Sequence, residues 1–260
     1  MSKKFFSNPI IEKLIPWFLP ILLIVCWFIF SNDGYLSKKI LPLPQDVFFS
    51  FVDLLKSGQL VKHISISFQR ALTGFLIGGG IGIILGLMNG LFPIAEKFLD
   101  TTIQMIRNIP HLAMIPIVVL WFGIGEESKI FLVALGVLFP VYVNTIHGIR
   151  SVDNGLIEMG KVYGLRSASL FWKVVLPGAL PSILVGIRYA LGIMWLTLIV
   201  SETIAANSGI GFLAMNAREF MQTDIIILSI LLYALFGKLA DFIAKQLEKH
   251  FLKWNPNYQK

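Results

Sequence analysis

Charged residues are scarce in this chain. Only 14% of its 260 residues are Asp, Glu, Lys or Arg, whereas soluble domains average about 25%. Cysteine is scarcer still, because Cys26 is the single one. It can form no internal disulfide, and a packed apolar thiol is its best interpretation. A disulfide-stabilised secreted domain is therefore excluded, and an ordinary soluble protein is disfavoured.

Short sequence motifs of common active sites are also missing. There is no Walker A phosphate loop, no H-E-x-x-H, no C-x-x-C and no G-x-S-x-G. No basic cluster is interleaved with aromatic residues, so nucleic acid is not an expected partner. The histidines lack the spacing of metal ligands and are expected to be ordinary, satisfied side chains: His63, His111, His147 and His250. We expect no catalytic residue, no metal site and no cofactor in this chain.

Long apolar segments dominate the sequence instead, and 56% of its residues are apolar. A helix needs roughly 20 apolar residues to cross the hydrocarbon core of a bilayer. Six segments approach that length, the third being short and containing two prolines: Leu14–Phe30, Ala71–Gly90, Ile109–Gly123, Ile130–Ile149, Ala179–Ser201 and Ile225–Ala240. A helix-rich soluble core is the alternative, but it has little use for an uncharged run such as Ala71–Ala95. The pattern predicts an all-α polytopic membrane protein with about six transmembrane helices.

The distribution of Lys and Arg predicts the orientation of these helices, since cytoplasmic loops carry the excess of positive charge. With the N-terminus inside, inner segments hold 13 of these residues and outer segments hold 6. We count Arg107 among the inner ones, on an interfacial helix over residues 91–107. Both termini are then expected in the cytoplasm. The first apolar segment is expected to be a retained anchor, because 17 residues exceed the usual core of a signal peptide.

Glycines recur every fourth residue along the second apolar segment. They form one stripe on a helix: Gly74, Gly78, Gly82, Gly86 and Gly90. Helices in lipid attract one another through close backbone contact, which small residues permit. The stripe is therefore expected to pack against another helix. Sliding of helices over this smooth face during a conformational change is a further possibility.

A polar segment, Arg150–Pro177, separates the fourth and fifth apolar segments. Glu158–Tyr163 is predicted to be helical, and Gly164 can end that helix with positive φ. Arg166–Val174 is predicted to form a second helix. Leu176-Pro177 is expected to break the chain before the fifth span, because a residue before proline disfavours helical backbone. Two short helices at an angle suit a lever that transmits force; an ordinary long loop is the alternative.

Two ionisable residues stand out in the fifth apolar segment. Arg188 lies about ten residues into it, which is roughly 15 Å deep. A charge at that depth is costly and is usually functional or paired, so Arg188 either faces a pathway for anions or forms a structural ion pair. Glu202 lies near the outer end, where it either lines a gate or braces the outer turn. Lys238 is expected to extend toward the interface beside Asp241.

The polar segment resembles the cytoplasmic coupling loop of ABC importer permeases, E-A-A-x3-G-x9-I-x-L-P. Glu158, Gly164 and Leu176-Pro177 hold their places, while Met159 and Gly160 replace the alanines and Val174 replaces the isoleucine. Five further motifs are similar, in the same order, to the permease subfamily for nitrate, sulfonate, taurine and related anions: residues 41–44, 107–111, 120–125, 144–149 and 201–211. Residues 214–220 and 252–258 are most similar to aliphatic-sulfonate permeases.

The resemblance implies a type I ABC importer permease fold. Residues 1–62 would hold the N-terminal tail, first span and outer connection, residues 63–246 the transmembrane domain with coupling loop 150–177, and residues 247–260 a cytoplasmic tail. Its coupling residues would be Glu158, Gly160, Gly164, Leu176 and Pro177.

The resemblance also implies partners in a bacterial cell membrane. They are a second permease copy, two ATP-binding subunits that hold ATP and Mg, and an extracytoplasmic substrate-binding protein. The implied cargo is an aliphatic sulfonate; nitrate, taurine and a pyrimidine precursor of thiamine are alternatives. An ion-coupled secondary transporter is a more distant alternative, since we find no paired repeats in the sequence.

Overall fold

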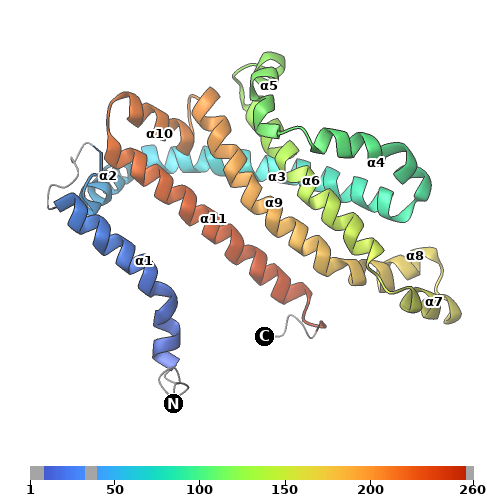
Figure 1. Cartoon of the computed structure of the whole chain (residues 1–260). Coiled ribbons are helices and arrows are strands. Elements are labelled where there is room, and N and C mark those ends of the chain that lie inside the picture. The colour runs from blue at the N-terminus through green and yellow to red at the C-terminus, as the bar shows by residue number, and fades with distance from the viewer. Residues whose placement is uncertain (1–8, 33–39, 256–260) are drawn as a thin grey trace. The chain divides into compact units, whose positions relative to one another are not determined.

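The computed structural model describes residues 9–32 and 40–255, and every regular element within those ranges is helical (Figure 1). In chain order the elements are α1 (Pro9–Asn32), α2 (Pro44–Lys56), α3 (Gln59–Leu91), α4 (Pro93–Arg107), η1 (His111–Met114), α5 (Ile115–Phe122), α6 (Glu126–Arg150), α7 (Asn154–Val162), α8 (Ser167–Leu170), η2 (Phe171–Val175), α9 (Leu176–Ala205), α10 (Ile210–Glu219) and α11 (Thr223–Phe251). The first short helix, η1, is a 3₁₀ helix and η2 is a π-helix.

Several of these helices are long and apolar enough to cross a membrane. Within the described residues there are four such helices, Gln59–Leu91, Glu126–Arg150, Ser167–Ile204 and Thr223–Phe251. The bent pair Pro93–Arg107 and His111–Phe122 brings the number to five if it counts as one span, and Trp17–Asn32 is a shorter apolar helix. The prediction of an all-α polytopic membrane protein is confirmed.

The described chain divides into two compact units. One contains the residues up to Lys62 together with Leu213–Leu231. Within it, the indole N–H of Trp27 donates to the Pro42 carbonyl at 2.9 Å, and the hydroxyl of Ser31 donates to the Leu41 carbonyl at 2.8 Å. These bonds hold the end of α1 against the segment that leads into α2.

The second unit, His63–Phe212 with the residues from Leu232 onward, has the packing of α6 against α9 as its core. The two helices run side by side in Figure 1. Small residues bring their backbones close together, since a Cβ on Gly148 would lie 2.6 Å from the Ala179 carbonyl oxygen. The hydroxyl of Ser182 also donates to the Asn144 carbonyl at 2.9 Å.

The glycine stripe of α3 lies against α6. A Cβ on any of its five glycines would meet α6 at 3.0 Å or less: Gly74 at Val133, Gly78 at the Ala134 backbone, Gly82 at the Leu138 carbonyl, Gly86 at Thr145 and Gly90 at Ile149. Gly80, on the same helix, has nothing within 4 Å of such an atom. Close approach of two backbones therefore follows the stripe and is not a general property of α3.

The third span differs from the prediction. We expected an interfacial helix over residues 91–107 and a separate short span over Ile109–Gly123. In the structure α4 and η1–α5 are together long and apolar enough for one span, and the two parts meet at a bend of 79°. The two acidic residues of α4 are accommodated by α6, because Glu96 pairs with Arg150 at 2.6 Å and Asp100 accepts from the Tyr142 hydroxyl at 3.2 Å.

The glycine stripe gives a direct test of this packing. We expect Gly82→Leu to reduce the amount of folded protein in the membrane, because the new side chain would overlap the α6 backbone; overpacking costs about 1–3 kcal/mol or more. Gly80→Leu is the matched control on the same helix and should be tolerated. Yield and thermal stability of the detergent-purified variants measure the effect, and equal stability of the two would show that α3 does not depend on the stripe.

Candidate functional site

The polar segment between α6 and α9 begins with a capped helix. The carboxylate of Asp153 accepts a hydrogen bond from the Gly155 N–H at 2.7 Å, which satisfies one of the free donors at the start of α7. This cap starts the helix at Asn154, earlier than the predicted Glu158. Glu158 consequently lies in the middle of α7, where its side chain is exposed.

Gly164 ends this first helix with φ +79°, a conformation that side chains other than glycine rarely adopt. The N–H of Leu165 donates to the Gly160 carbonyl at 3.0 Å, and the N–H of Gly164 donates to the Lys161 carbonyl at 2.9 Å. This pair of bonds is the Schellman arrangement that closes a helix at a left-handed glycine. The chain thereby turns sharply toward α8.

The second half of the segment corrects the sequence prediction. Leu176-Pro177 does not break the chain, because Leu176 has helical φ and ψ of −64° and −46°, and Ser167–Ile204 is one continuous helix of 38 residues. The π-helix Phe171–Val175 immediately precedes Leu176-Pro177. Its wider hydrogen-bonding pattern accommodates the missing N–H and the ring of Pro177 without a break. Leu176 and Pro177 are thus part of a helix that joins the polar segment directly to the span.

Gly160 is the contact point between the two halves of the segment. It is buried, and a Cβ on it would lie 2.7 Å from Leu170, 3.3 Å from Leu165 and 3.5 Å from Val174. Any larger side chain would push α7 away from α8 and η2. The small residue therefore allows the two helices to move as one body.

Large apolar side chains are exposed around this contact. Five of them form what we name the coupling surface: Leu156 (48% exposed), Met159 (51%), Val162 (85%), Tyr163 (80%) and Trp172 (67%). Three of them, Leu156, Met159 and Tyr163, line a groove of about 440 Å³ that Lys173 and Trp254 also line. Exposed apolar patches of this kind mark interaction sites. The sequence pattern identified Glu158 and the glycines but did not assign Trp172 or Trp254 to this surface.

Arg188 is paired with acidic residues of α11. Its guanidinium donates to one Asp241 oxygen at 2.9 Å from Nε and 2.6 Å from Nη2, and it lies 3.6 Å from Glu248. Lys238 and Lys245 also approach Asp241, at 3.9 and 3.0 Å. Arg188 thus forms ion pairs with α11, and its role, in a pathway for anions or in structure, stays a prediction.

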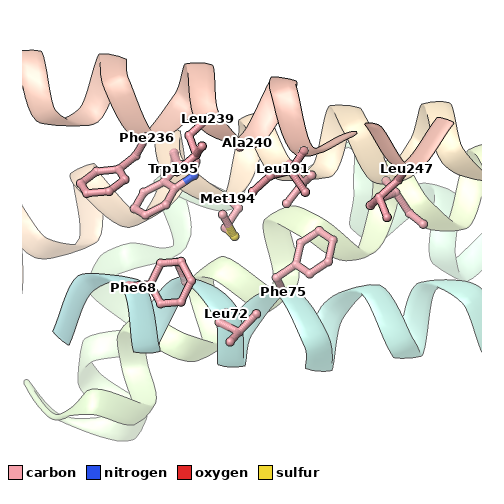
Figure 2. A pocket seen from close by; sticks show the side chains of 13 residues that line it. Phe68, Leu72, Phe75, Leu191, Met194, Trp195, Phe236, Leu239, Ala240 and Leu247 are labelled. Carbon is pink, nitrogen blue, oxygen red and sulfur yellow. The ribbon is translucent and has the colours of Figure 1, made fainter. Parts of the chain in front are cut away.

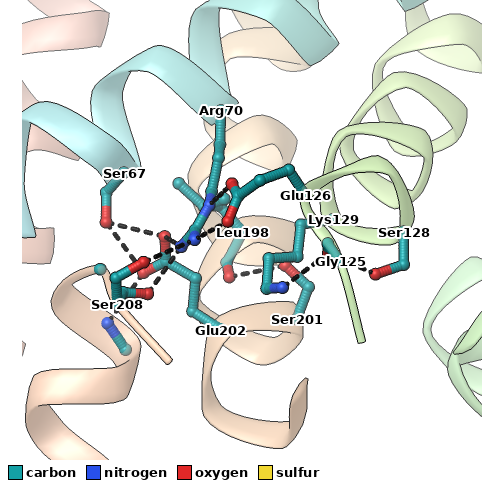
Figure 3. Close-up of polar contacts among 12 residues, drawn as sticks. Ser67, Arg70, Gly125, Glu126, Ser128, Lys129, Leu198, Ser201, Glu202 and Ser208 are labelled. Carbon is teal, nitrogen blue, oxygen red and sulfur yellow. Dashed lines mark hydrogen bonds and ion pairs between the residues drawn. The ribbon is translucent and has the colours of Figure 1, made fainter. Parts of the chain in front are cut away.

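Glu202 lies at the centre of a buried polar cluster (Figure 3). Its carboxylate accepts hydrogen bonds from Arg70 and Ser67, both at 2.8 Å, from the Gly211 N–H at 2.9 Å and from Tyr233 at 3.0 Å. Glu202 is only 1% exposed and Arg70 only 2%. These bonds join Glu202 to α3, α10 and α11 beside the turn after α9, and its role as a gate or a brace stays a prediction.

Arg70 connects this cluster to two further segments, and the sequence alone did not predict its role. It donates to both oxygens of Glu126 at the start of α6, each at 2.5 Å. It also donates to the carbonyl and hydroxyl of Ser208, at 2.6 and 2.8 Å. One guanidinium therefore fixes α3, α6, α9 and the turn after α9 at a single point.

An apolar cavity of about 240 Å³ lies among α3, α9 and α11 (Figure 2). It is lined by aromatic and aliphatic side chains, among them Phe68, Phe75, Met194, Trp195 and Phe236. The indole N–H of Trp195 is buried and has no hydrogen-bond acceptor among the described residues. No ionisable residue lines the cavity, so it does not suit an anion.

Comparisons with known proteins place the chain in a family. Residues 78–253 match the family described as binding-protein-dependent transport system inner membrane component. A protein of Escherichia coli (strain K12) named as an aliphatic sulfonates transport permease, SsuC, is 60% identical over 95% of this chain and 94% of its own length. A protein of Bacillus subtilis (strain 168) with the same name is 44% identical over 93% and 87%. The crystal structure of an amino acid ABC transporter with histidines has a chain that aligns with a TM-score of 0.58 and 18% identity, over 76% of this chain and 98% of that one.

The buried cluster predicts a large effect of one neutral substitution. We expect Glu202→Gln to lower the melting temperature of the purified protein, because Arg70 loses one of its two carboxylate partners and a buried acceptor of several hydrogen bonds becomes neutral. Glu127→Gln is the control, since Glu127 is exposed beside the cluster. Equal melting temperatures for Glu202→Gln and Glu127→Gln would contradict the bracing role.

Proposed function

This chain belongs to the family of binding-protein-dependent transport system inner membrane components, and we propose that it is the permease subunit of an ATP-driven importer for aliphatic sulfonates. The observation that carries the proposal is the coupling surface. A helical hairpin fused to a membrane span presents exposed apolar side chains around a groove. The hairpin fits a docking site for a protein that exerts force on the span.

The docking partner in this proposal is an ATP-binding subunit. The sequence carries no phosphate-binding loop, so another chain would bind ATP and Mg and hydrolyse the nucleotide. Two such subunits would dock on two copies of this permease, one on each coupling surface. An extracytoplasmic binding protein would deliver the substrate. The family supports these two classes of partner, and the pairing of two identical permeases is our inference from it.

Force applied at the coupling surface would travel through rigid contacts. Gly160 holds α7 against Leu170 and Val174, and the helix from Ser167 continues without interruption to Ile204. A push on Tyr163 or Trp172 would therefore turn the long helix as a lever. Alternating access requires that the partner bind the inward-open and outward-open states with different affinity.

The proposal places both termini and the coupling surface in the cytoplasm of a bacterial cell. The excess of Lys and Arg in the inner segments supports this orientation. Moving Arg107 from an inner segment into the bent span does not change the sign of that excess. Residues 63–246 would form the transmembrane domain, with the segments on either side, residues 1–62 and 247–260, as additions to it.

The cargo is proposed to be an alkanesulfonate because two relatives named for aliphatic sulfonates match nearly the whole chain. Nitrate, taurine and a pyrimidine precursor of thiamine remain alternatives. Uptake of a radiolabelled alkanesulfonate by cells lacking only this chain, with and without a plasmid copy, tests the proposal. Restored uptake that excess unlabelled nitrate or taurine does not suppress would support it, and uptake independent of the chain would refute it.

Reversal of the Glu158 charge tests the docking role. We expect Glu158→Lys to abolish uptake and to lower recovery of the ATP-binding subunit during purification, while the permease still inserts in the membrane. The reason is that an exposed carboxylate on α7 is available to a basic group of the partner.

Asp53→Lys is the matched control, because Asp53 is exposed on α2 and has the same charge. Quantitative blotting of membranes separates a loss of coupling from a loss of protein. Normal uptake and normal recovery of the ATP-binding subunit with Glu158→Lys would contradict the proposal.

A further inference from the structure

The bend between α4 and α5 lies at the middle of the membrane-spanning region. Three contacts with α6 place it along that helix: Glu96 pairs with Arg150, Asp100 with Tyr142, and His111 lies against Gly136. Gly136 is ten residues from Glu126 at the start of α6, or roughly 15 Å along its axis. That is about half of a hydrocarbon core of roughly 30 Å. Figure 1 shows the turn between α4 and α5. Because α6 is long and apolar enough to cross a membrane, we infer that this turn interrupts the helical backbone near mid-membrane.

The residues of the bend are exposed in the described chain. Asn108, Ile109 and Pro110 are all exposed, and the exposed fraction of Ile109 is 47%. Non-helical backbone at this depth is tolerated only where it is buried in protein or lines a water-filled space, because lipid offers no hydrogen bonds. Since the bend is not buried by its own chain, it must face an aqueous path or another subunit. A lipid-facing position is excluded by the same argument.

Arg107 adds a positive charge at this place. It ends α4, it is exposed, and it makes no ion pair or side-chain hydrogen bond with any described residue. A cation near mid-membrane that has no counter-charge is costly and is typical of substrate or ion pathways. Arg188 and Arg70, in contrast, are each bound to two carboxylates. The guanidinium of Arg107 therefore keeps its N–H donors available for a ligand at the bend.

The corner that carries Arg107 is held in position by polar and apolar contacts. His111 Nε2 lies 3.0 Å from Thr197 Oγ1 of α9, and Leu112 and Met114 pack into the buried cluster of Ile115, Val118 and Leu132. The bend is thus fixed to the same helix that continues from the coupling surface. A movement of α9 would therefore displace the bend directly.

We propose that the bend lines the transport path and that the Arg107 guanidinium binds the anionic head of the transported sulfonate. A guanidinium presents paired N–H donors that match sulfonate oxygens as they match carboxylates. The side chain of Ile109, exposed at 47% in the bend itself, would receive the alkyl tail. This inference rests on the proposed function, and it names the residue that recognises the substrate class.

The experiment uses the full transporter, reconstituted with its ATP-binding subunit and binding protein in vesicles, and measures uptake of a radiolabelled alkanesulfonate. Arg107→Gln should raise the KM for uptake or lower its maximal rate by about ten-fold or more. This is the effect expected from the loss of one hydrogen bond between charged groups. Arg107→Lys should restore part of the activity. Lys97→Gln is the matched control, an exposed cation on the same helix, and should transport like the parent.

A second measurement tests the aqueous path without relying on transport. In a Cys26→Ser background, Asn108→Cys should react with a charged, membrane-impermeant thiol reagent. The alkanesulfonate should slow this reaction when Arg107 is present but not when Arg107→Gln is added to the same variant. Phe98→Cys, an exposed apolar position of α4, should not react.

Each outcome decides one of the two proposals. Parental uptake with Arg107→Gln, or a loss explained wholly by less assembled complex, would overturn the role of Arg107. An unreactive Asn108→Cys would overturn the aqueous path. If the parent complex takes up no alkanesulfonate but the Asn108→Cys variant reacts with the thiol reagent, the proposed cargo is wrong and the aqueous path is supported.

Discussion

Close backbone contact between α3, α6 and α9 is the constraint on which the rest of this unit depends. Lipid supplies no hydrophobic attraction between helices, so association requires close contact and satisfied polar groups. The glycines of α3 and the small residues between α6 and α9 permit that contact. Because the three helices have little freedom to shift independently, polar groups at both ends can be placed accurately. The Arg70 cluster at one end and the coupling surface at the other both depend on this frame.

The charges within the helices fall into two kinds, and the difference is physical. Arg70 and Arg188 are each neutralised by carboxylates from neighbouring helices, so they hold elements together. Such pairs are strongly destabilising to break but add little net stability. Arg107 has no partner among the described residues and lies at an exposed bend. An unpaired charge at such a depth stabilises no contact within the chain. We therefore infer that the bend binds an anionic ligand.

The sequence predicted some of this structure and not the rest, for identifiable reasons. Composition and apolar length sufficed for the fold class, because the bilayer imposes both. The period of the glycines predicted a packing stripe but not its partner, since periodicity contains no information on which helix lies opposite. The bent span was missed because the charges of α4 suggested an interface, whereas α6 satisfies Glu96 and Asp100. The proline at residue 177 suggested a break, and a local π-turn removed the conflict.

The continuity of the helix from Ser167 to Ile204 links the candidate sites to one another. Trp172 lies on its exposed first turns, Thr197 contacts His111 at the bend, and Glu202 anchors the turn that follows. A rigid helix cannot rotate at one end alone, so a displacement at the coupling surface must act on the bend or on the Glu202 cluster. At the cluster, Arg70 on α3 is bound to three other segments, whereas His111 beside the bend makes a single polar contact with α9. The mechanically weaker point is thus the bend, which is where a transporter that changes access at mid-membrane has to yield.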